Sequence, residues 1–250
     1  MFDVIILAGT AKPSELTTSE NVHNKAFLLI KGKTMLEYVI TALRQVNKVN
    51  RIAVVGPQAE LAELAEKFSG VCVVPEGRNI VENMEQGAAA LKPKQHFLVA
   101  SADIPFLTAA AVQDFLAACS PYSADLYYPI VRRIDNDRRF PGVKRTYVKL
   151  RDGEFTGGNI FLVNSMCLEQ ALPRLEEIFA LRKSPFRLAA TLGWGFVLKL
   201  LTQRLSIAEL EKRFSALFGI DGRAVISSYP EIATDVDKPS DLLLAKQQLK

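Results

Sequence analysis

Cysteine and histidine are scarce in this 250-residue chain. The three cysteines, Cys72, Cys119 and Cys167, lie far apart and form no CxxC pair, which argues against a disulfide framework or a zinc site and fits a reducing compartment. The two histidines, His23 and His96, have no serine, cysteine or carboxylate pattern around them that would indicate a triad. A hydrolase that depends on nucleophilic catalysis is therefore disfavoured.

Long hydrophobic runs and a large excess of one charge are also missing. No window reaches the roughly 18 consecutive apolar residues of a membrane-spanning helix, and we find no signal-type segment. The formal net charge of +4 is small for this length, and few aromatic residues are interleaved with the basic ones. These absences predict a soluble, cytoplasmic protein that does not bind nucleic acid.

Short apolar strands alternate with helix-like segments through the first half of the chain. The predicted strands are Val4–Leu7, Arg51–Val55, Val71–Val74 and Phe97–Ala100. The predicted helices are Met35–Val46, which begins with a capping box at Thr34 and Glu37, then Ala59–Phe68, Ile80–Leu91 and Ala109–Ala118. Apolar strands of this kind are typical of a parallel sheet covered on both faces, so the rhythm predicts an α/β fold with a Rossmann-like, doubly wound sheet.

Beyond Ser120 the rhythm changes. Further strands are predicted, with loops between the first three of them, at Leu126–Val131, Tyr147–Leu150, Asn159–Val163 and Arg223–Ser227. We expect the first three to extend the sheet edge in a mixed or antiparallel way. Residues 166 to 217 are predicted to be mainly helical, and a helix follows the last strand. With no repeat, low-complexity tract or clear linker, residues 1–250 are predicted to form a single domain with a helical insertion over about 166–220.

The first strand runs into a small-residue turn, Ala8-Gly9-Thr10, and a polar loop then leads to Lys25. Such a turn lets backbone N–H groups approach an anionic ligand, and Lys25 or Lys12 can supply positive charge for phosphate oxygens. The alternative is an ordinary strand-to-helix turn with a solvated lysine. Because ligands of open α/β sheets bind at the carboxyl ends of the strands, the turn is a candidate phosphate site.

Aspartates lie in two places that could reach the same sheet edge. Asp103 comes just after the strand Phe97–Ala100, where a carboxylate can hold Mg²⁺ against triphosphate oxygens. Asp235 and Asp237 precede the last predicted helix. If Asp237 faces Asp103, the two carboxylates repel each other unless a cation lies between them, which favours a metal. Helix caps and turns are the alternative roles of these aspartates.

A basic stretch in the middle of the chain contains Arg132, Arg133, Arg138, Arg139, Lys144, Arg145, Lys149 and Arg151. Guanidinium groups bind phosphate in a bidentate way, so this stretch predicts a site for a phosphorylated second substrate. A solvated loop is the alternative. Next along the chain, Thr156-Gly157-Gly158-Asn159 allows either close approach of a ligand or a tight hairpin turn.

Apolar and basic side chains crowd the segment from about residue 179 to 205. They include Phe186, Leu188, Leu192, Trp194, Phe196, Val197, Leu200 and Leu201, with Arg182, Lys183, Arg187, Lys199 and Arg204 around them. We expect this segment to pack on the domain or to form a homodimer contact. A peripheral membrane surface is the alternative that we do not favour, and we expect vesicles of anionic lipid not to sediment the protein.

Four segments in a fixed order carry a resemblance. They are Leu7-Ala8-Gly9-Thr10; Lys25 to Ile30 followed by Gly32-Lys33-Thr34; Asp103-Ile104-Pro105; and Asp235-Val236-Asp237-Lys238-Pro239-Ser240-Asp241-Leu242. Together they resemble the MobA-like (molybdopterin-nucleotidyltransferase-like) family within the sugar-phosphate and isoprenoid nucleotidyltransferases. The resemblance implies a GT-A-type, Rossmann-like three-layer sandwich that transfers NMP from an NTP to a phosphorylated small-molecule acceptor and releases pyrophosphate.

The resemblance also implies roles for single residues. Lys25 and Asp103 are then catalytic, and Asp103 and Asp237 hold Mg²⁺. The nucleotide-binding residues are Leu7, Ala8, Gly9, Thr10, Lys12, Arg78, Asn83, which has the base-reading position, and Gly87. For the acceptor, our candidates are Arg132, Arg145, Gly158 and Asn159.

The sequence departs from the family pattern in the phosphate loop. Thr10 stands where the family has a second glycine, and the loop from Gly9 to Lys25 contains no arginine. Two alternatives to a nucleotidyltransferase therefore remain. One is a GT-A-fold glycosyltransferase that uses an NDP-sugar, with Asp235-Val236-Asp237 as its metal motif. The other is a non-catalytic, regulatory protein that binds nucleotide.

Overall fold

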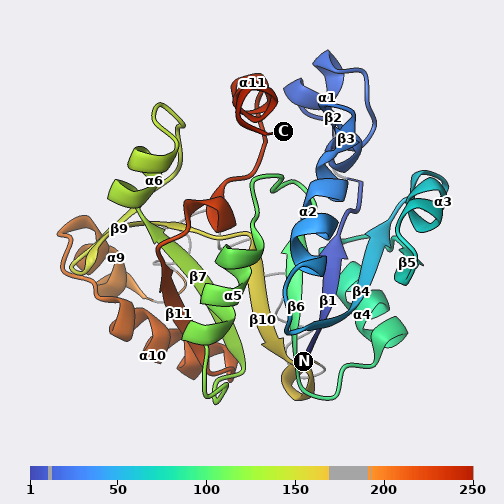
Figure 1. Ribbon diagram of the computed structural model, residues 1–250. Coiled ribbons are helices and arrows are strands. Elements are labelled where there is room, and N and C mark those ends of the chain that lie inside the picture. The colour runs from blue at the N-terminus through green and yellow to red at the C-terminus, as the bar shows by residue number, and fades with distance from the viewer. Residues whose placement is uncertain (11–12, 169–190, 192, 250) are drawn as a thin grey trace.

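A nine-stranded mixed sheet crosses the computed structural model, which describes residues 1–10, 13–168, 191 and 193–249 (Figure 1). The strands lie in the order β5 (Val71–Pro75), β4 (Val49–Gly56), β1 (Phe2–Leu7), β6 (His96–Ser101), β10 (Ile160–Asn164), β7 (Leu126–Arg132), β9 (Gly153–Gly157) and β8 (Val148–Leu150), and β11 (Gly222–Ser227) pairs with β7 as well. All of these strands except β9 and β10 run in one direction. The expected mostly parallel, mixed sheet is confirmed.

Helices cover both faces of the sheet. One face packs against α2 (Met35–Arg44), α3 (Gln58–Lys67) and α5 (Ala109–Ala118), and the other packs against α4 (Ile80–Leu91) and α10 (Ile207–Phe218). Side chains of a strand alternate between the faces, so Val4 and Ile6 of β1 join the first core whereas Ile5 joins the second. The apolar run that predicted a strand covered on both sides is explained by these two cores.

Helix α2 begins where the sequence predicts it. The Glu37 carboxylate accepts a hydrogen bond from the Thr34 N–H at 2.6 Å, and the Thr34 hydroxyl accepts one from the Glu37 N–H at 3.2 Å. This capping box satisfies two N–H groups that the first helical turn leaves without partners. The apolar stripe of α2, with Leu36, Val39 and Leu43, then points into the first core.

The segment around Gly158 differs from a tight hairpin, one of the two interpretations of its glycines. β9 and β10 do not pair with each other, because both pair with β7, at Ile130–Arg132 and at Leu126–Tyr127 respectively. Gly158 lies between them and donates its N–H to the Pro129 carbonyl at 2.8 Å. A Cβ on Gly158 would lie 2.7 Å from Pro129 Cγ, so the close approach of two backbones requires a glycine here.

Several short elements lie where the sequence predicts only loops, among them α1 (Glu15–Ser19), α6 (Arg133–Arg139) and β9. Each is polar or glycine-containing and has few apolar residues, so it lacks the periodicity that predicts an element. α1 begins with a capping box between Ser14 and Thr17, and its Leu16 is fully buried. In the predicted helical region, α9 (Trp194–Leu201) and α10 are present, whereas residues 169–190 and 192 lie outside the described residues.

A third, smaller core lies beyond the carboxyl ends of the central strands. It joins Leu16 of α1, Leu28 and Ile30 near β2 (Leu29–Ile30), and Leu242 of α11 (Pro239–Gln248). β2 pairs with β3 (Lys33–Thr34) in a separate small sheet. In Figure 1, α1 and α11 lie together at the top, beyond the arrowheads of β1 and β4. Segments from both halves of the sequence are thereby held above one edge of the sheet.

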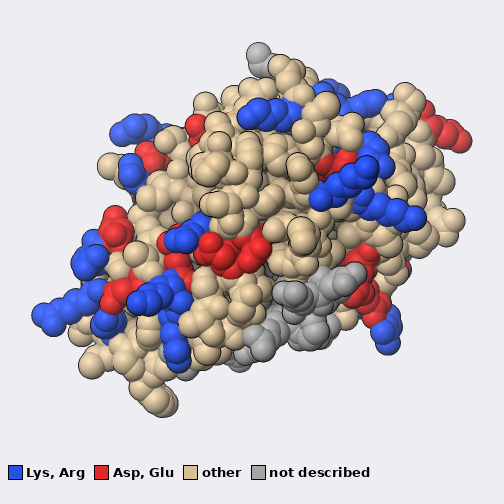
Figure 2. Space-filling view, turned by 90° about the horizontal axis from the view of Figure 1, so that it is seen from below, with Lys and Arg blue, Asp and Glu red and all other residues tan. Residues whose placement is uncertain are grey.

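Charged and apolar side chains are both found on the described surface. On the face shown in Figure 2, basic and acidic side chains are interspersed among large uncharged areas. Within the described residues, no helix combines the length and apolar character that crossing a bilayer requires. α9 does carry exposed apolar side chains, among them Trp194, Leu198 and Leu201.

Candidate active site

A pocket opens at the carboxyl ends of β1 and β6. These strands end together, with Leu7 in register with Ser101, and the Ala102 N–H donates to the Leu7 carbonyl at 3.2 Å. The pocket is lined by Leu7, Ala8, Gly9, Ser14, Thr17, His23, Asn24, Lys25, Ala26, Ser101, Ala102, Asp103 and Asp237. Five residues that the sequence predicts for nucleotide binding or catalysis, together with the metal candidate Asp237, thus border one cavity, at the edge where open α/β sheets bind ligands.

The turn after β1 is in contact with α4. A Cβ on Gly9 would lie only 2.4 Å from Asn83 Nδ2, so a larger residue than glycine would displace the Asn83 side chain. Asn83 is buried and accepts a hydrogen bond from the Gly77 N–H at 2.6 Å. The predicted phosphate turn and the predicted base-reading residue therefore lie side by side.

Thr10 is held by a residue that sequence reasoning did not assign to the site. Both the N–H and the hydroxyl of Thr10 donate to the Glu76 carboxylate, the hydroxyl at 2.9 Å. Glu76 follows β5, two strands away from β1 in the sheet. A backbone N–H that could meet a phosphate thus already has an anionic partner within the protein.

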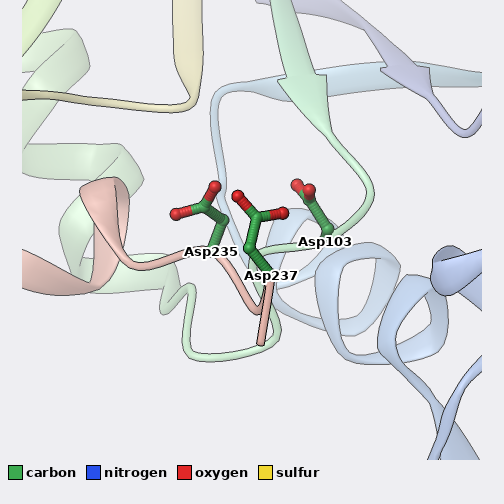
Figure 3. Close-up of side chains that lie close together, drawn as sticks. All are labelled: Asp103, Asp235 and Asp237. Carbon is green, nitrogen blue, oxygen red and sulfur yellow. The ribbon is translucent and has the colours of Figure 1, made fainter. Parts of the chain in front are cut away.

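Three aspartates meet beside the pocket. The Val236 N–H donates to the Asp103 carbonyl at 2.9 Å, which fixes the segment before α11 against the loop after β6. Asp103, Asp235 and Asp237 each offer a carboxylate oxygen within 4.8 Å of the others. In the view of Figure 3, Asp237 lies between the other two. The expected meeting of Asp103 with Asp237 is thus present in the structure, and Asp235 joins it.

Lys25 bridges two of these carboxylates. Its ammonium forms ion pairs with Asp103 Oδ2 and Asp237 Oδ1. Burial on its own would lower the pKa of Lys25, but the charges of Asp103 and Asp237 outweigh burial and hold that pKa above its usual value. Lys25 is therefore a fixed positive charge at neutral pH.

The backbone at Lys25 is fixed by its neighbour. Asn24 is buried, donates from Nδ2 to the Ala8 carbonyl at 2.7 Å, and accepts the Ala26 N–H at 2.9 Å. It thereby caps the short helix η1 (Lys25–Phe27) and ties it to the turn after β1. Asn24 was not among the predicted site residues, although an asparagine before a short helix is a recognisable cap.

Asp235 is paired from the opposite side by Arg145. An Arg145 Nη1–Asp235 Oδ1 ion pair joins them, and only 14% and 18% of these side chains are exposed. Burial raises the pKa of Asp235 to about 6, against the opposing effect of Arg145 and with the charges of Asp103 and Asp237 adding to the rise. Nε and Nη2 of Arg145 are buried and have no hydrogen-bond partner among the described residues.

The donor set of this cluster fits a divalent cation. Mg²⁺ prefers oxygen ligands and binds through one or two carboxylates together with substrate phosphates and water. Asp103 is buried and Asp237 is exposed, so the pair offers one fixed ligand and one that solvent and substrate can reach. Asp103 and Asp237 therefore have the chemistry to hold Mg²⁺.

The four acceptor candidates differ in their surroundings. Asn159 is hydrogen-bonded on both sides, accepting from the Ser101 N–H and donating its own N–H to the Ile232 carbonyl, each at 2.9 Å. Gly158 precedes it. Arg145 contacts Asp235, whereas Arg132 is exposed at the start of α6. The structure thus brings Arg145 into contact with the cluster and joins Asn159 to Ser101 at the end of β6, and it gives no contact of Arg132 with the aspartates.

Four of the predicted nucleotide-binding residues are described by the structure but do not line the pocket, namely Arg78, Gly87, Asn83 and Thr10, of which the last two adjoin Gly9. Arg78 is exposed and paired with Glu82. A Cβ on Gly87 would lie 2.6 Å from Ile5 Cγ2, so this glycine allows α4 to pack closely on β1 inside the core. Lys12 lies outside the described residues.

Comparisons with known proteins agree with this geometry. The sequence profile of the MobA-like NTP transferase domain matches residues 4–184. A solved structure from Thermus thermophilus, described as a hypothetical transferase, is 38% identical, covers 96% of this chain and 99% of its own, and superposes with a TM-score of 0.81. No curated protein matches the chain.

Two more distant structures share the fold. The 4-diphosphocytidyl-2C-methyl-D-erythritol synthase from Anaerococcus prevotii is 14% identical, with coverage of 100% of this chain and 96% of its own, and a TM-score of 0.60. A CMP:2-keto-3-deoxy-manno-octonic acid synthetase in complex with CTP is 13% identical, with 99% and 98% coverage and a TM-score of 0.59. These identities support the Rossmann-type α/β fold alone. On the match over residues 4–184 and the 38% identity, the chain belongs to the MobA-like NTP transferase family.

Proposed function

We propose that this protein is a Mg²⁺-dependent nucleotidyltransferase that transfers NMP from an NTP to a phosphorylated small-molecule acceptor and releases pyrophosphate. The observation that carries the proposal is the meeting of Asp103, Asp237 and Lys25 at the pocket that begins with Gly9. Family membership supports the same chemistry.

Nucleotidyl transfer of this type needs alignment and charge neutralisation more than covalent catalysis. An oxygen of the acceptor phosphate is already a nucleophile; it attacks the α-phosphorus of the NTP, and the bond to the bridging oxygen of pyrophosphate breaks. No general base is required, which agrees with the scarcity of histidine in the sequence.

The protein's groups have separate tasks in this proposal. The backbone at Gly9 and Thr10 receives the phosphates, Lys25 neutralises their charge, and Asn83 contacts the base. Asp103 and Asp237 would hold Mg²⁺, which supplies positive charge to the triphosphate when it is bound. Arg145, Gly158 and Asn159 are the proposed acceptor side. Nε and Nη2 of Arg145 are buried and have no partner in the part of the chain that the structure describes, which suits an anion there.

A non-catalytic, nucleotide-binding protein is a second candidate, and the Thr10–Glu76 contact favours it. A carboxylate that already holds the N–H and hydroxyl of Thr10 competes with a phosphate for them. Such a protein would bind an NTP and turn over none of a broad panel of phosphorylated acceptors. Preference for an NDP-sugar over free NTP would instead indicate a glycosyltransferase.

The first experiment is thermal unfolding with each of the four NTPs, with Mg²⁺ and with EDTA. CTP is the first to test, because one neighbour in the fold is named as a complex with CTP. Ligand at about 100 times its Kd adds about 2.7 kcal/mol of stability. We expect one nucleotide to raise the Tm much more with Mg²⁺ than with EDTA, and pyrophosphate release then identifies the acceptor. No shift with any NTP would refute the proposal.

A further inference from the structure

The ammonium of Lys25 lies in contact with the two carboxylates that we assign to the metal. It pairs with Asp103 Oδ2 and with Asp237 Oδ1, and 26% of the Lys25 side chain is exposed to the pocket side. The remaining carboxylate of the cluster, Asp235, is paired with Arg145. Each acidic group therefore has a cation supplied by the protein itself.

The side chain of Lys25 can change position while its backbone stays fixed. Its backbone belongs to η1, which the Asn24 hydrogen bonds to Ala8 and Ala26 hold in place. A lysine carries its charge on a flexible stem of four carbons and has three equivalent donors. The ammonium can therefore exchange one set of anionic partners for another without a change in the fold.

A divalent cation and the Lys25 ammonium compete for Asp103 and Asp237. Two cations on the same carboxylates repel each other strongly at this distance, and the site is partly shielded from water. Free metal must therefore bind against the charge of Lys25 or displace the ammonium from its two partners. A metal that arrives with a triphosphate brings new anionic partners for the displaced ammonium, because Lys25 lines the same pocket as Gly9.

We propose that Lys25 excludes free metal from Asp103 and Asp237, so that the substrate this site accepts is the preformed complex of divalent cation and nucleotide. The inference rests on the proposed function, because it specifies the form in which the NTP binds. On binding, Lys25 exchanges two carboxylates for phosphate oxygens while the cation takes its place. Metal and nucleotide then strengthen each other's binding by the same factor, as linkage requires.

The test compares wild type with Lys25→Met in binding of Mn²⁺ alone, followed by the electron paramagnetic resonance of free Mn²⁺. We expect the variant to bind Mn²⁺ on the order of 10-fold more tightly, within the usual range of coupling between sites. The gain must disappear in Lys25→Met with Asp103→Asn. Lys246→Met is the matched control, because Lys246 pairs with Glu20 and does not line the pocket, and its Mn²⁺ affinity should equal that of wild type.

Calorimetry with the best NTP completes the test. In wild type, Mn²⁺ should strengthen NTP binding on the order of 10-fold, and in Lys25→Met this factor should be smaller, because only the direct contact between metal and phosphate remains. If Lys25→Met does not fold, as judged by circular dichroism, Lys25→Gln replaces it in every arm. Equal or weaker Mn²⁺ binding by a folded variant overturns the inference, even where wild type releases pyrophosphate. Tighter Mn²⁺ binding by the variant, with no NTP bound by wild type, supports exclusion by Lys25 and refutes the proposed function instead.

Discussion

Two basic residues hold the same acidic cluster from opposite sides, and they do so differently. Lys25 approaches from the pocket and contacts Asp103 and Asp237, of which Asp237 is half exposed, with 51% of its side chain accessible. Arg145 approaches from the other side and contacts only Asp235, and both of these side chains are largely buried. The pocket side of the cluster is thus accessible to solvent, whereas the Arg145–Asp235 pair is largely buried.

The chemistry of the two side chains matches their surroundings. A lysine ammonium is a point charge on a flexible stem, and an arginine guanidinium is a rigid fork that loses less freedom when it is fixed. An exchangeable contact suits the side where substrate enters, and a permanent contact suits a buried carboxylate. We therefore expect changes on the Lys25 side to alter binding and catalysis, and changes on the Arg145 side to alter stability first.

The largest expected effect comes from Asp103, the buried partner of Lys25. Asp103→Asn removes the charge that the proposed metal and Lys25 share, and it should lower pyrophosphate release by about 10²–10³-fold, as the loss of one transition-state stabiliser does. The measurement is a steady-state assay of pyrophosphate with the best NTP and acceptor. Asp114→Asn is the control, since Asp114 is exposed on α5 and should keep full activity. Activity in Asp103→Asn equal to wild type would remove Asp103 from the site.

Arg145→Met tests the buried pair between Arg145 and Asp235. It leaves the largely buried carboxylate of Asp235 without its cation, and breaking such a pair costs about 3 kcal/mol of unfolding free energy. Urea unfolding at about pH 7.5 in EDTA measures this loss. The double variant Arg145→Met, Asp235→Asn should recover most of it, because no unpaired charge remains. Arg138→Met, on the exposed surface of α6, is the control and should lose little.

The loss of unfolding free energy in Arg145→Met should depend on pH in a defined direction. The pKa of Asp235 is raised to about 6 in the folded protein. Ionisation of Asp235 therefore lowers the free energy of unfolding as pH rises from the pKa of the unfolded chain to about 6, and it has no influence below the unfolded pKa. Without Arg145 the raised pKa rises further. The loss in Arg145→Met should therefore be smaller at about pH 5 than at pH 7.5. A loss that grows on acidification would contradict the burial of a charged Asp235.

The smallest expected effect concerns Glu76, which holds Thr10 as Lys25 holds the carboxylates. Glu76→Gln removes a negative charge from the N–H and hydroxyl of Thr10, so nucleotide affinity should rise about 5-fold, or about 1 kcal/mol. Calorimetric titration with the best NTP measures the change. Glu60→Gln, an exposed change on α3, should leave affinity unaltered. A weaker affinity in Glu76→Gln would instead make Glu76 a nucleotide ligand.

Local patterns predict much of the fold. The apolar run of β1 and the capping box at Thr34 and Glu37 depend only on neighbouring residues, and both are present as expected. Elements without periodicity, such as α6, are not predictable in this way, because their position depends on ion pairs with distant segments. An example is the pair between Arg139 and Glu231.

The candidate site is predictable only in part, and for a related reason. Asp103 and Asp237 could be brought together through the family resemblance, since their distance along the chain hides the contact. The contact of Thr10 with Glu76 and that of Asp235 with Arg145 depend on which strand ends lie beside each other, and no local motif contains that information. The need for a glycine at position 87 is likewise not predictable from local sequence, because it depends on the packing of α4 against Ile5 of β1.

The hydrogen bond from the Val236 N–H to the Asp103 carbonyl has a consequence for the order in which the protein is made. The ribosome adds Asp103 well before Asp235 and Asp237, so a nascent chain can build β1, β4, β5 and β6 while it still lacks two of the three carboxylates. Until the later segment docks, Lys25 has only one of its two acidic partners. A chain that ends before Asp235 lacks two of the three carboxylates, so the acidic cluster can be completed only late in synthesis.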